Sequence, residues 1–121
     1  MMTESGFDPS VINDLIDLGP DTGVQLVKDL IELFYAEAPM RLDAMRTGIR
    51  SQNPEGVAYA AHAMRGGAGN LGALRIGALC AEIEALARSG DLSAAPSLVD
   101  QIELELDQVS AILQRRVAEL R

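Results

Sequence analysis

The sequence predicts an all-α protein, an antiparallel four-helix bundle with a short additional N-terminal helix. Aromatic residues make up only 3% of the chain, whereas Ala, Leu, Glu and Met are abundant, and this composition favours helix over strand. Apolar residues also recur at steps of three and four, the period of a helix with one buried face. With 121 residues, 48% of them hydrophobic, the chain can fill one core without a disulfide or a metal. We therefore expect a single domain over residues 1–121, with the bundle over about residues 21–120.

Capping residues and prolines bound the first two helices. Asp8 is suited to cap a short helix over about residues 8–18, with Pro9 in its first turn. A second helix should run from residue 21 or 22 to about residue 51. Its apolar period continues through Pro39, so we expect one kinked helix here instead of two separate helices.

The other three helices have similar boundary signals. Asn53 should cap a third helix that ends near Leu71, and a fourth should span about residues 74–89. Asp91 or Ser93 should cap the last helix, which reaches almost to the C-terminus. Long helices joined by short loops pack most simply as antiparallel neighbours.

Charge and composition exclude several classes of partner. The formal net charge is −8 and the 10 basic residues are scattered along the chain, so no nucleic-acid-binding surface is predicted. No apolar stretch approaches the roughly 20 residues that cross a bilayer, and the N-terminus has no basic, apolar leader. A single cysteine, Cys80, excludes an intramolecular disulfide. We expect a cytoplasmic protein that binds neither nucleic acid nor membrane.

The third helix carries the only histidine of the chain, His62, outside its apolar face. At about 100° per residue, His62 lies roughly 140° from the centre of the apolar arc of this helix. His62 should therefore project into solvent from the middle of the helix. Taken alone, an exposed histidine is most often an ordinary solvated surface residue. The apolar arc consists of Val57, Ala61, Met64, Ala68 and Leu71.

Three glycines follow this histidine within the helix. Gly66, Gly67 and Gly69 each cost about 0.8 to 1 kcal/mol relative to Ala in a helix interior. Close packing of another helix could explain Gly67, which lies near the core boundary. Gly66 and Gly69 share the solvent face of His62, where removing side chains clears an approach for the active site of another protein. This pattern indicates that the active site of another protein approaches the imidazole.

Arg65 is a helical neighbour of His62, three residues further along. A guanidinium forms charge-assisted, often bidentate hydrogen bonds to phosphate oxygens. As a cation it should also favour the neutral imidazole, which is the nucleophilic form. The pair therefore suits a phosphoryl group on His62, with Arg65 as its counter-charge.

The run over residues 62–73 resembles the signature of histidine phosphotransfer (HPt) domains, which is His-x-hydrophobic-Lys/Arg-Gly-small-small-x-x-hydrophobic-Gly. The resemblance extends to Pro39 in the preceding helix and to Glu82, Glu84 and Arg88 in the following one, and so covers nearly the whole chain. The matching residues are His62-Ala63-Met64-Arg65-Gly66-Gly67-Ala68-Gly69-Asn70-Leu71-Gly72-Ala73.

The resemblance implies a phosphotransfer protein of a two-component phosphorelay. His62 would accept a phosphoryl group, through Nε2, from an aspartate of a receiver domain and pass it reversibly to another receiver. The implied partners are response-regulator receiver domains and a hybrid sensor histidine kinase. The receiver would supply Mg²⁺, and this chain is expected to bind no cofactor or metal of its own.

Residues that orient His62 are harder to predict. The family often has a serine where this chain has Gly67, and the hydroxyl of that serine could help to hold the imidazole or phosphate. Glu84, Arg88 and, on the second helix, Gln25 are the other candidates for this role.

The docking surface is predicted from exposure on two helices. Ala63 lies with Gly66 and Gly69 around His62 on the third helix. The apolar face of the first helix is wider than a helix this short needs for one contact, so an edge of it should stay exposed. The candidate docking residues on the first helix are Val11, Ile12 and Leu15.

Two other classes of function compete with phosphotransfer. One is an interaction or dimerisation module that binds a receiver or kinase without carrying phosphate. The heptad spacing of Leu106, Leu113 and Leu120 could support a coiled-coil dimer, although a bundle core explains the same stripe and a monomer is expected. The other is an enzyme with Cys80 as nucleophile and His62 as base.

The enzyme hypothesis is the weaker one. Cys80 belongs to the apolar stripe of the fourth helix and should be buried, away from the outward-facing His62. One histidine and one buried cysteine do not make a metal-ligand set. The chain also has no nucleotide-binding loop signature, so we expect a phosphocarrier without autokinase activity and not an enzyme.

Overall fold

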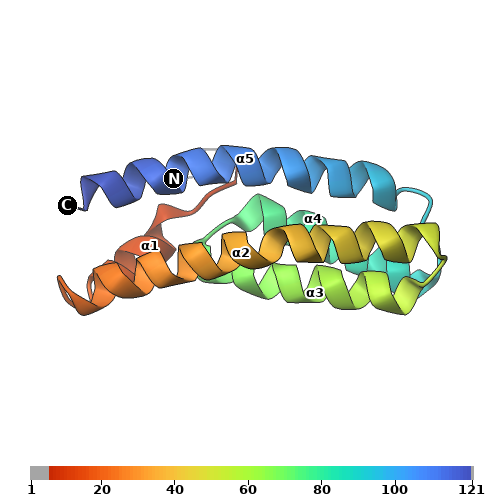
Figure 1. Cartoon of the computed structure of the whole chain (residues 1–121), viewed down its shortest axis with the longest axis horizontal. Helices are drawn as coiled ribbons and strands as arrows, with labels where there is room; N and C mark the ends of the chain where they lie inside the picture. Colours follow the sequence, from red (N-terminus) through yellow and green to blue (C-terminus); the bar gives the residue numbers. More distant parts are fainter. Residues whose placement is uncertain (1–5, 121) are drawn as a thin grey trace.

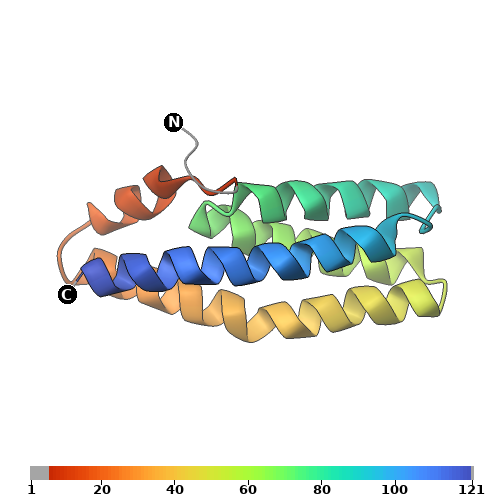
Figure 2. The same cartoon turned by 90° about the horizontal axis from the view of Figure 1, so that it is seen from above.

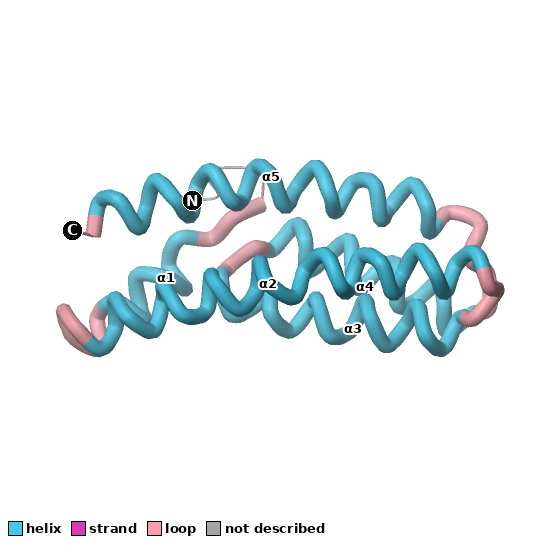
Figure 3. Tube along the Cα trace, in the orientation of Figure 1, coloured by secondary structure: helices cyan, strands magenta, loops and turns pink. Residues whose placement is uncertain are grey.

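The computed structural model describes residues 6–120 and shows an all-helical bundle, as the sequence predicts (Figure 1). The long helices α2, α3, α4 and α5 run antiparallel to their chain neighbours, and the short α1 lies at one end (Figures 1 and 3). The only β pairing among residues 6–120 is an isolated bridge between Phe7 and Ala73. The helices are α1 (Pro9–Ile16), α2 (Thr22–Arg50), α3 (Pro54–Leu71), α4 (Leu74–Ser89) and α5 (Ala95–Glu119).

Most predicted helix boundaries are confirmed, with the expected caps. The side chain of Asp8 accepts a hydrogen bond from a backbone N–H at the start of α1, and Asn53 does the same at the start of α3. α3 and α4 end at Gly72 and Gly90, whose φ angles of 78° and 84° are left-handed and favour glycine. α1 is shorter than predicted, because the chain leaves the helix after Ile16 and forms a turn.

The predicted start of the last helix is wrong. α5 begins at Ala95, and the residue before it, Ala94, provides no side-chain cap. Asp91 instead accepts hydrogen bonds from the backbone N–H (3.0 Å) and the hydroxyl (2.7 Å) of Ser93. These bonds close a turn over residues 91–93, before the helix begins, so neither side chain caps α5.

α2 is one continuous helix that contains Pro39 and changes direction near its middle (Figure 2). A proline has no N–H to donate and its ring crowds the preceding turn, which bends the helix without ending it. Next to this bend the phenol of Tyr35 donates a hydrogen bond to the carbonyl of Leu106, 2.8 Å away, and thereby ties α2 to α5. The prediction of one kinked helix is confirmed.

The core runs along the whole bundle, and α3 packs between α2 and α4. Of the apolar stripe predicted for α5, Leu106 and Leu113 are buried, whereas Leu120 is half-buried near the end of the helix. The end of α3 is fixed to α1, because the backbone N–H of Asp8 donates to the carbonyl of Gly72 at 2.8 Å. None of the helices within residues 6–120 is long and apolar enough to cross a membrane.

Candidate functional site

His62 projects from the middle of α3 on the side away from the core. Its side chain is 61% exposed, whereas the five predicted core positions of α3 are at most 2% exposed. The helical period therefore placed this residue correctly. The neighbouring helix α4 packs against α3, and both helices supply polar contacts of the imidazole.

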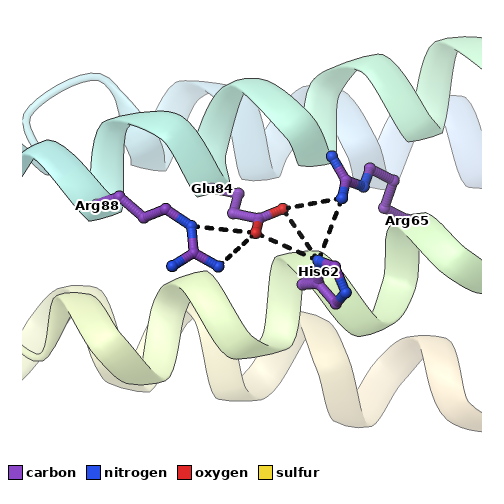
Figure 4. A network of polar contacts seen from close by, with 4 residues as sticks. All are labelled: His62, Arg65, Glu84 and Arg88. Carbon is purple, nitrogen blue, oxygen red and sulfur yellow. Dashed lines mark hydrogen bonds and ion pairs between the residues drawn. The ribbon is translucent and has the colours of Figure 1, made fainter.

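The imidazole is held through one nitrogen only. Figure 4 shows Nδ1 facing the carboxylate of Glu84 on α4, at 3.2 Å from Oε2 and 3.4 Å from Oε1. The guanidinium of Arg65, one turn further along α3, also approaches Nδ1, with Nη2 at 3.2 Å. Nε2 makes no polar contact with any residue that the structure describes and points away from Glu84. The ring thus has a fixed inner nitrogen and an open outer one.

Glu84 is the most buried charged residue of this group. Its side chain is only 10% exposed, and Arg88, one turn later on α4, binds one of its oxygens through Nη2 (2.7 Å) and Nε (3.2 Å). Hydrogen bonds from Arg88, with further contributions from His62 and Arg65, lower the pKa of Glu84 in spite of its burial. The residue facing Nδ1 is therefore a carboxylate anion at neutral pH.

The charges around His62 favour an anion at the open side of the ring. Arg65 and Arg88 bring two positive charges, and Glu84 brings one negative charge. Arg65 contacts Glu84 less closely than Arg88 does, at 3.6 Å, and its side chain is 44% exposed. The three side chains together carry one excess positive charge, and Arg65 is an exposed cation that an anion on the ring could approach.

Of the predicted orienting residues, the structure brings Glu84 and Arg88 to the site but not the other two. Gln25 donates a hydrogen bond to Asp29 on the exposed side of α2. Gly67 faces α2, where a Cβ atom would lie 2.8 Å from the ring of Phe34. Any side chain at this position would crowd that ring, so Gly67 is explained by close helix packing.

Gly66 and Gly69 lie on the open face, as predicted. A Cβ atom at either position would meet no other atom within 4 Å, so packing within residues 6–120 does not require a glycine at either place. Beside them, Ala63 is half-buried and has a small side chain. At Gly66 and Gly69 the exposed surface of α3 beyond His62 therefore carries no side chain.

Comparison with known proteins agrees with this geometry. The family model of the Hpt domain matches residues 29–112, which include His62, Arg65, Glu84 and Arg88. The chain belongs to the Hpt domain family. It is similar to the crystal structure of histidine-containing phosphotransfer protein B (HptB) from Pseudomonas aeruginosa PAO1, with a TM-score of 0.85 and 25% sequence identity over 98% of this chain and 100% of that one. No curated protein sequence matches the chain.

The predicted docking edge of α1 in this Hpt domain is only partly correct. Val11 and Leu15 are half-buried and keep an exposed part. Ile12 is wrong as a docking residue, because its side chain is completely buried in the core. A short amphipathic helix can rotate about its axis to bury its largest side chain, and its period alone does not determine that rotation.

Sequence reasoning missed an apolar surface that the Hpt domain presents on α2. A groove between α2 and α3 runs beside Ala63 and Met64 and is bordered by Leu33, whose side chain is exposed. Met40, further along α2, is exposed as well. The available signal was that Leu33 and Met40 are large apolar residues outside the period of the buried positions of α2, which include Phe34, Ala38 and Leu42.

The alternative enzyme site is not formed. Cys80 is completely buried in the core, and burial raises the pKa of its thiol to about 12. It is therefore a neutral packing residue at physiological pH, without access to the exposed His62. Within residues 6–120 no group of three or more histidine, cysteine, aspartate or glutamate side chains is arranged to hold a metal ion.

Proposed function

We propose that this Hpt domain is the phosphotransfer protein of a two-component phosphorelay, with His62 as the residue that carries the phosphoryl group. One observation supports the assignment most strongly: Nδ1 faces a buried carboxylate while Nε2 is open to solvent without a protein partner. This arrangement leaves one nitrogen to be oriented and the other to react.

The chemistry follows from the contacts of the ring. A neutral imidazole whose Nδ1–H donates to Glu84 has its lone pair on Nε2. That lone pair would form a bond to phosphorus, while the bond between phosphorus and the aspartate oxygen of the receiver breaks and leaves its electron pair on that oxygen. The positive charge that develops on the ring would face the carboxylate of Glu84, as in other carboxylate–imidazole pairs.

Arg65 would balance the charge of the phosphoryl group. Its exposed guanidinium needs only a change of side-chain rotamer to move from Nδ1 to the outer side of the ring. Arg88 is held on Glu84 by two hydrogen bonds and keeps that carboxylate in place. The two arginines thus have different roles, one toward phosphate and one toward the orienting residue.

The remaining chemistry would come from the partners. We infer that response-regulator receiver domains and a hybrid sensor histidine kinase dock on the open face around Ala63, Gly66 and Gly69, and that the receiver supplies Mg²⁺. The half-buried edge of α1 at Val11 and Leu15 would extend this docking surface. The protein itself would act as a monomeric phosphocarrier in the cytoplasm.

Transfer of label from a phosphorylated receiver tests this proposal. A receiver carrying ³²P on its aspartate should label the wild-type protein with acid-labile, base-stable phosphate, and His62→Gln should abolish the labelling. Continued labelling of the His62→Gln variant would contradict the assignment. Binding of the receiver to both proteins without labelling of either would favour the interaction module.

A further inference from the structure

Nδ1 of His62 has two polar neighbours that require opposite protonation states of this nitrogen. A guanidinium only donates hydrogen bonds, so Arg65, with Nη2 at 3.2 Å, requires an unprotonated Nδ1. A carboxylate only accepts, so Glu84, with Oε2 also at 3.2 Å, requires Nδ1–H. In the neutral ring the two hydrogen bonds therefore exclude each other.

Which of these two hydrogen bonds forms at Nδ1 decides whether Nε2 is a nucleophile. When Arg65 donates to Nδ1, the single proton of the neutral ring lies on Nε2, which then has no in-plane lone pair to attack phosphorus. When Nδ1 donates to Glu84, the lone pair lies on the exposed Nε2. Arg65 in the position seen here thus favours the unreactive tautomer, and Glu84 favours the reactive one.

We propose that Arg65 and Glu84 compete for Nδ1 of His62, and that a phosphorylated partner selects the reactive tautomer by drawing Arg65 away to the phosphoryl group. This inference rests on the proposed function and adds a means by which the substrate activates its own acceptor. The competition would lower the population of the reactive tautomer until a phosphoryl donor arrives.

The two competitors differ in how firmly they are held. Arg65 is 44% exposed and its ion pair with Glu84 is long, at 3.6 Å, so an incoming anion can displace it. Glu84 is 10% exposed and is bound by Arg88 at 2.7 Å, so it remains beside the ring when Arg65 leaves. In the transfer itself, the Nδ1 proton stays between the ring and Glu84. Nε2 forms the bond to phosphorus while the bond from phosphorus to the donor oxygen breaks and leaves its electron pair on that oxygen.

The ¹⁵N spectrum of the imidazole measures this competition directly, because the chain contains a single histidine. At about pH 8, where an ordinary histidine is neutral, the shifts of Nδ1 and Nε2 give the ratio of the tautomers. Arg65→Ala should raise the fraction of Nδ1–H and Glu84→Ala should lower it. Arg50→Ala, which removes an exposed arginine bonded only to Thr47 among the described residues, should leave the ratio unchanged.

An unchanged ratio in Arg65→Ala, with an intact backbone amide spectrum, would overturn the competition. Should the alanine variant lose its fold, Arg65→Met keeps the side-chain stem, removes the donor and must raise the Nδ1–H fraction in the same way. An unchanged ratio in Glu84→Ala would equally contradict the proposed role of Glu84.

Phosphoramidate, a small phosphoryl donor, tests the effect of the substrate. In the unphosphorylated wild type it should raise the Nδ1–H fraction, and in Arg65→Ala it should produce no further change. A wild-type ratio that does not respond would overturn the selection by the donor. Phosphohistidine formation in the same samples is a separate readout: a ratio that responds without any phosphohistidine would contradict the proposed function and leave the competition intact.

Discussion

The carboxylate of Glu84 on α4 lies 3.2 Å from Nδ1 of His62 on α3 and is almost buried beneath the exposed imidazole. A contact between these helices therefore fixes which nitrogen of the histidine faces inward. The proposed phosphoryl acceptor of this Hpt domain is thus oriented from a second helix, and the two helices must pack correctly for this arrangement to form.

Removal of the Glu84 carboxylate should slow phosphoryl transfer without removing the acceptor. Loss of a hydrogen bond to a charged group costs about 1.5 to 3 kcal/mol, so Glu84→Ala should reduce the transfer rate roughly 10- to 150-fold. Glu82→Ala, which removes an exposed glutamate from the same helix, is the matched control. Rapid-quench measurement with a phosphorylated receiver checks both, and equal rates for the two variants would refute the orienting role.

Arg88 should stabilise the fold only at pH values at which Glu84 is ionised. Because the folded-state pKa of Glu84 is lowered, its ion pair contributes stability above the ordinary carboxyl pKa of 4.5, and this stability is lost as the pH falls through the lowered value. The wild type should therefore unfold at higher urea concentration than Arg88→Ala at pH 7, and the difference should shrink below pH 4.5. A difference that is constant over this range would contradict the coupling.

Substitutions at two adjacent glycines should have opposite effects. Gly66→Leu adds a side chain where nothing lies within 4 Å, so the fold should be kept or gain up to about 1 kcal/mol of helix propensity. Gly67→Leu would push a side chain into the ring of Phe34 and should cost about 1 to 3 kcal/mol. The midpoint temperature of thermal unfolding distinguishes the two variants, since it should be kept or raised in Gly66→Leu and lowered in Gly67→Leu.

The access function of Gly66 has its own kinetic test. Gly66→Leu should slow transfer from a receiver but leave phosphorylation by phosphoramidate nearly unchanged, because the small donor needs no flat docking surface. Equal rates for the variant and the wild type with the receiver would mean that this glycine has no part in access.

Cys80 should not react with alkylating agents while the protein is folded. Its thiol is buried and its pKa is raised to about 12, so almost no thiolate is exposed at pH 8. Mass spectrometry after treatment with iodoacetamide should show alkylation only in urea. Rapid alkylation of the native protein would reopen the enzyme hypothesis.

The sequence predicted features that depend on one helix alone. Helical periodicity placed His62, Gly66 and Gly69 on the open face and the apolar residues of α3 in the core. Contacts between helices were less predictable, since they depend on axial register and rotation. Glu84 and Gln25 were both plausible partners of the imidazole, and only the packing of α4 on α3 separates them.

The two errors have different physical origins. Ile12 was expected at a docking edge, but the rotation of α1 turned it into the core. Asp91 and Ser93 have the residue types of helix caps, yet their side chain and backbone groups close a turn before α5. Residue type predicts that a polar group will be satisfied locally and does not determine which local structure satisfies it.

The most direct measurement of the central claim is the chemical identity of the phosphorylated atom. After phosphorylation by a receiver, ³¹P–¹⁵N coupling in protein labelled with ¹⁵N-histidine should place the phosphoryl group on Nε2 of His62. Phosphate bonded to Nδ1, or found on any other residue, would contradict an acceptor oriented by Glu84 through Nδ1.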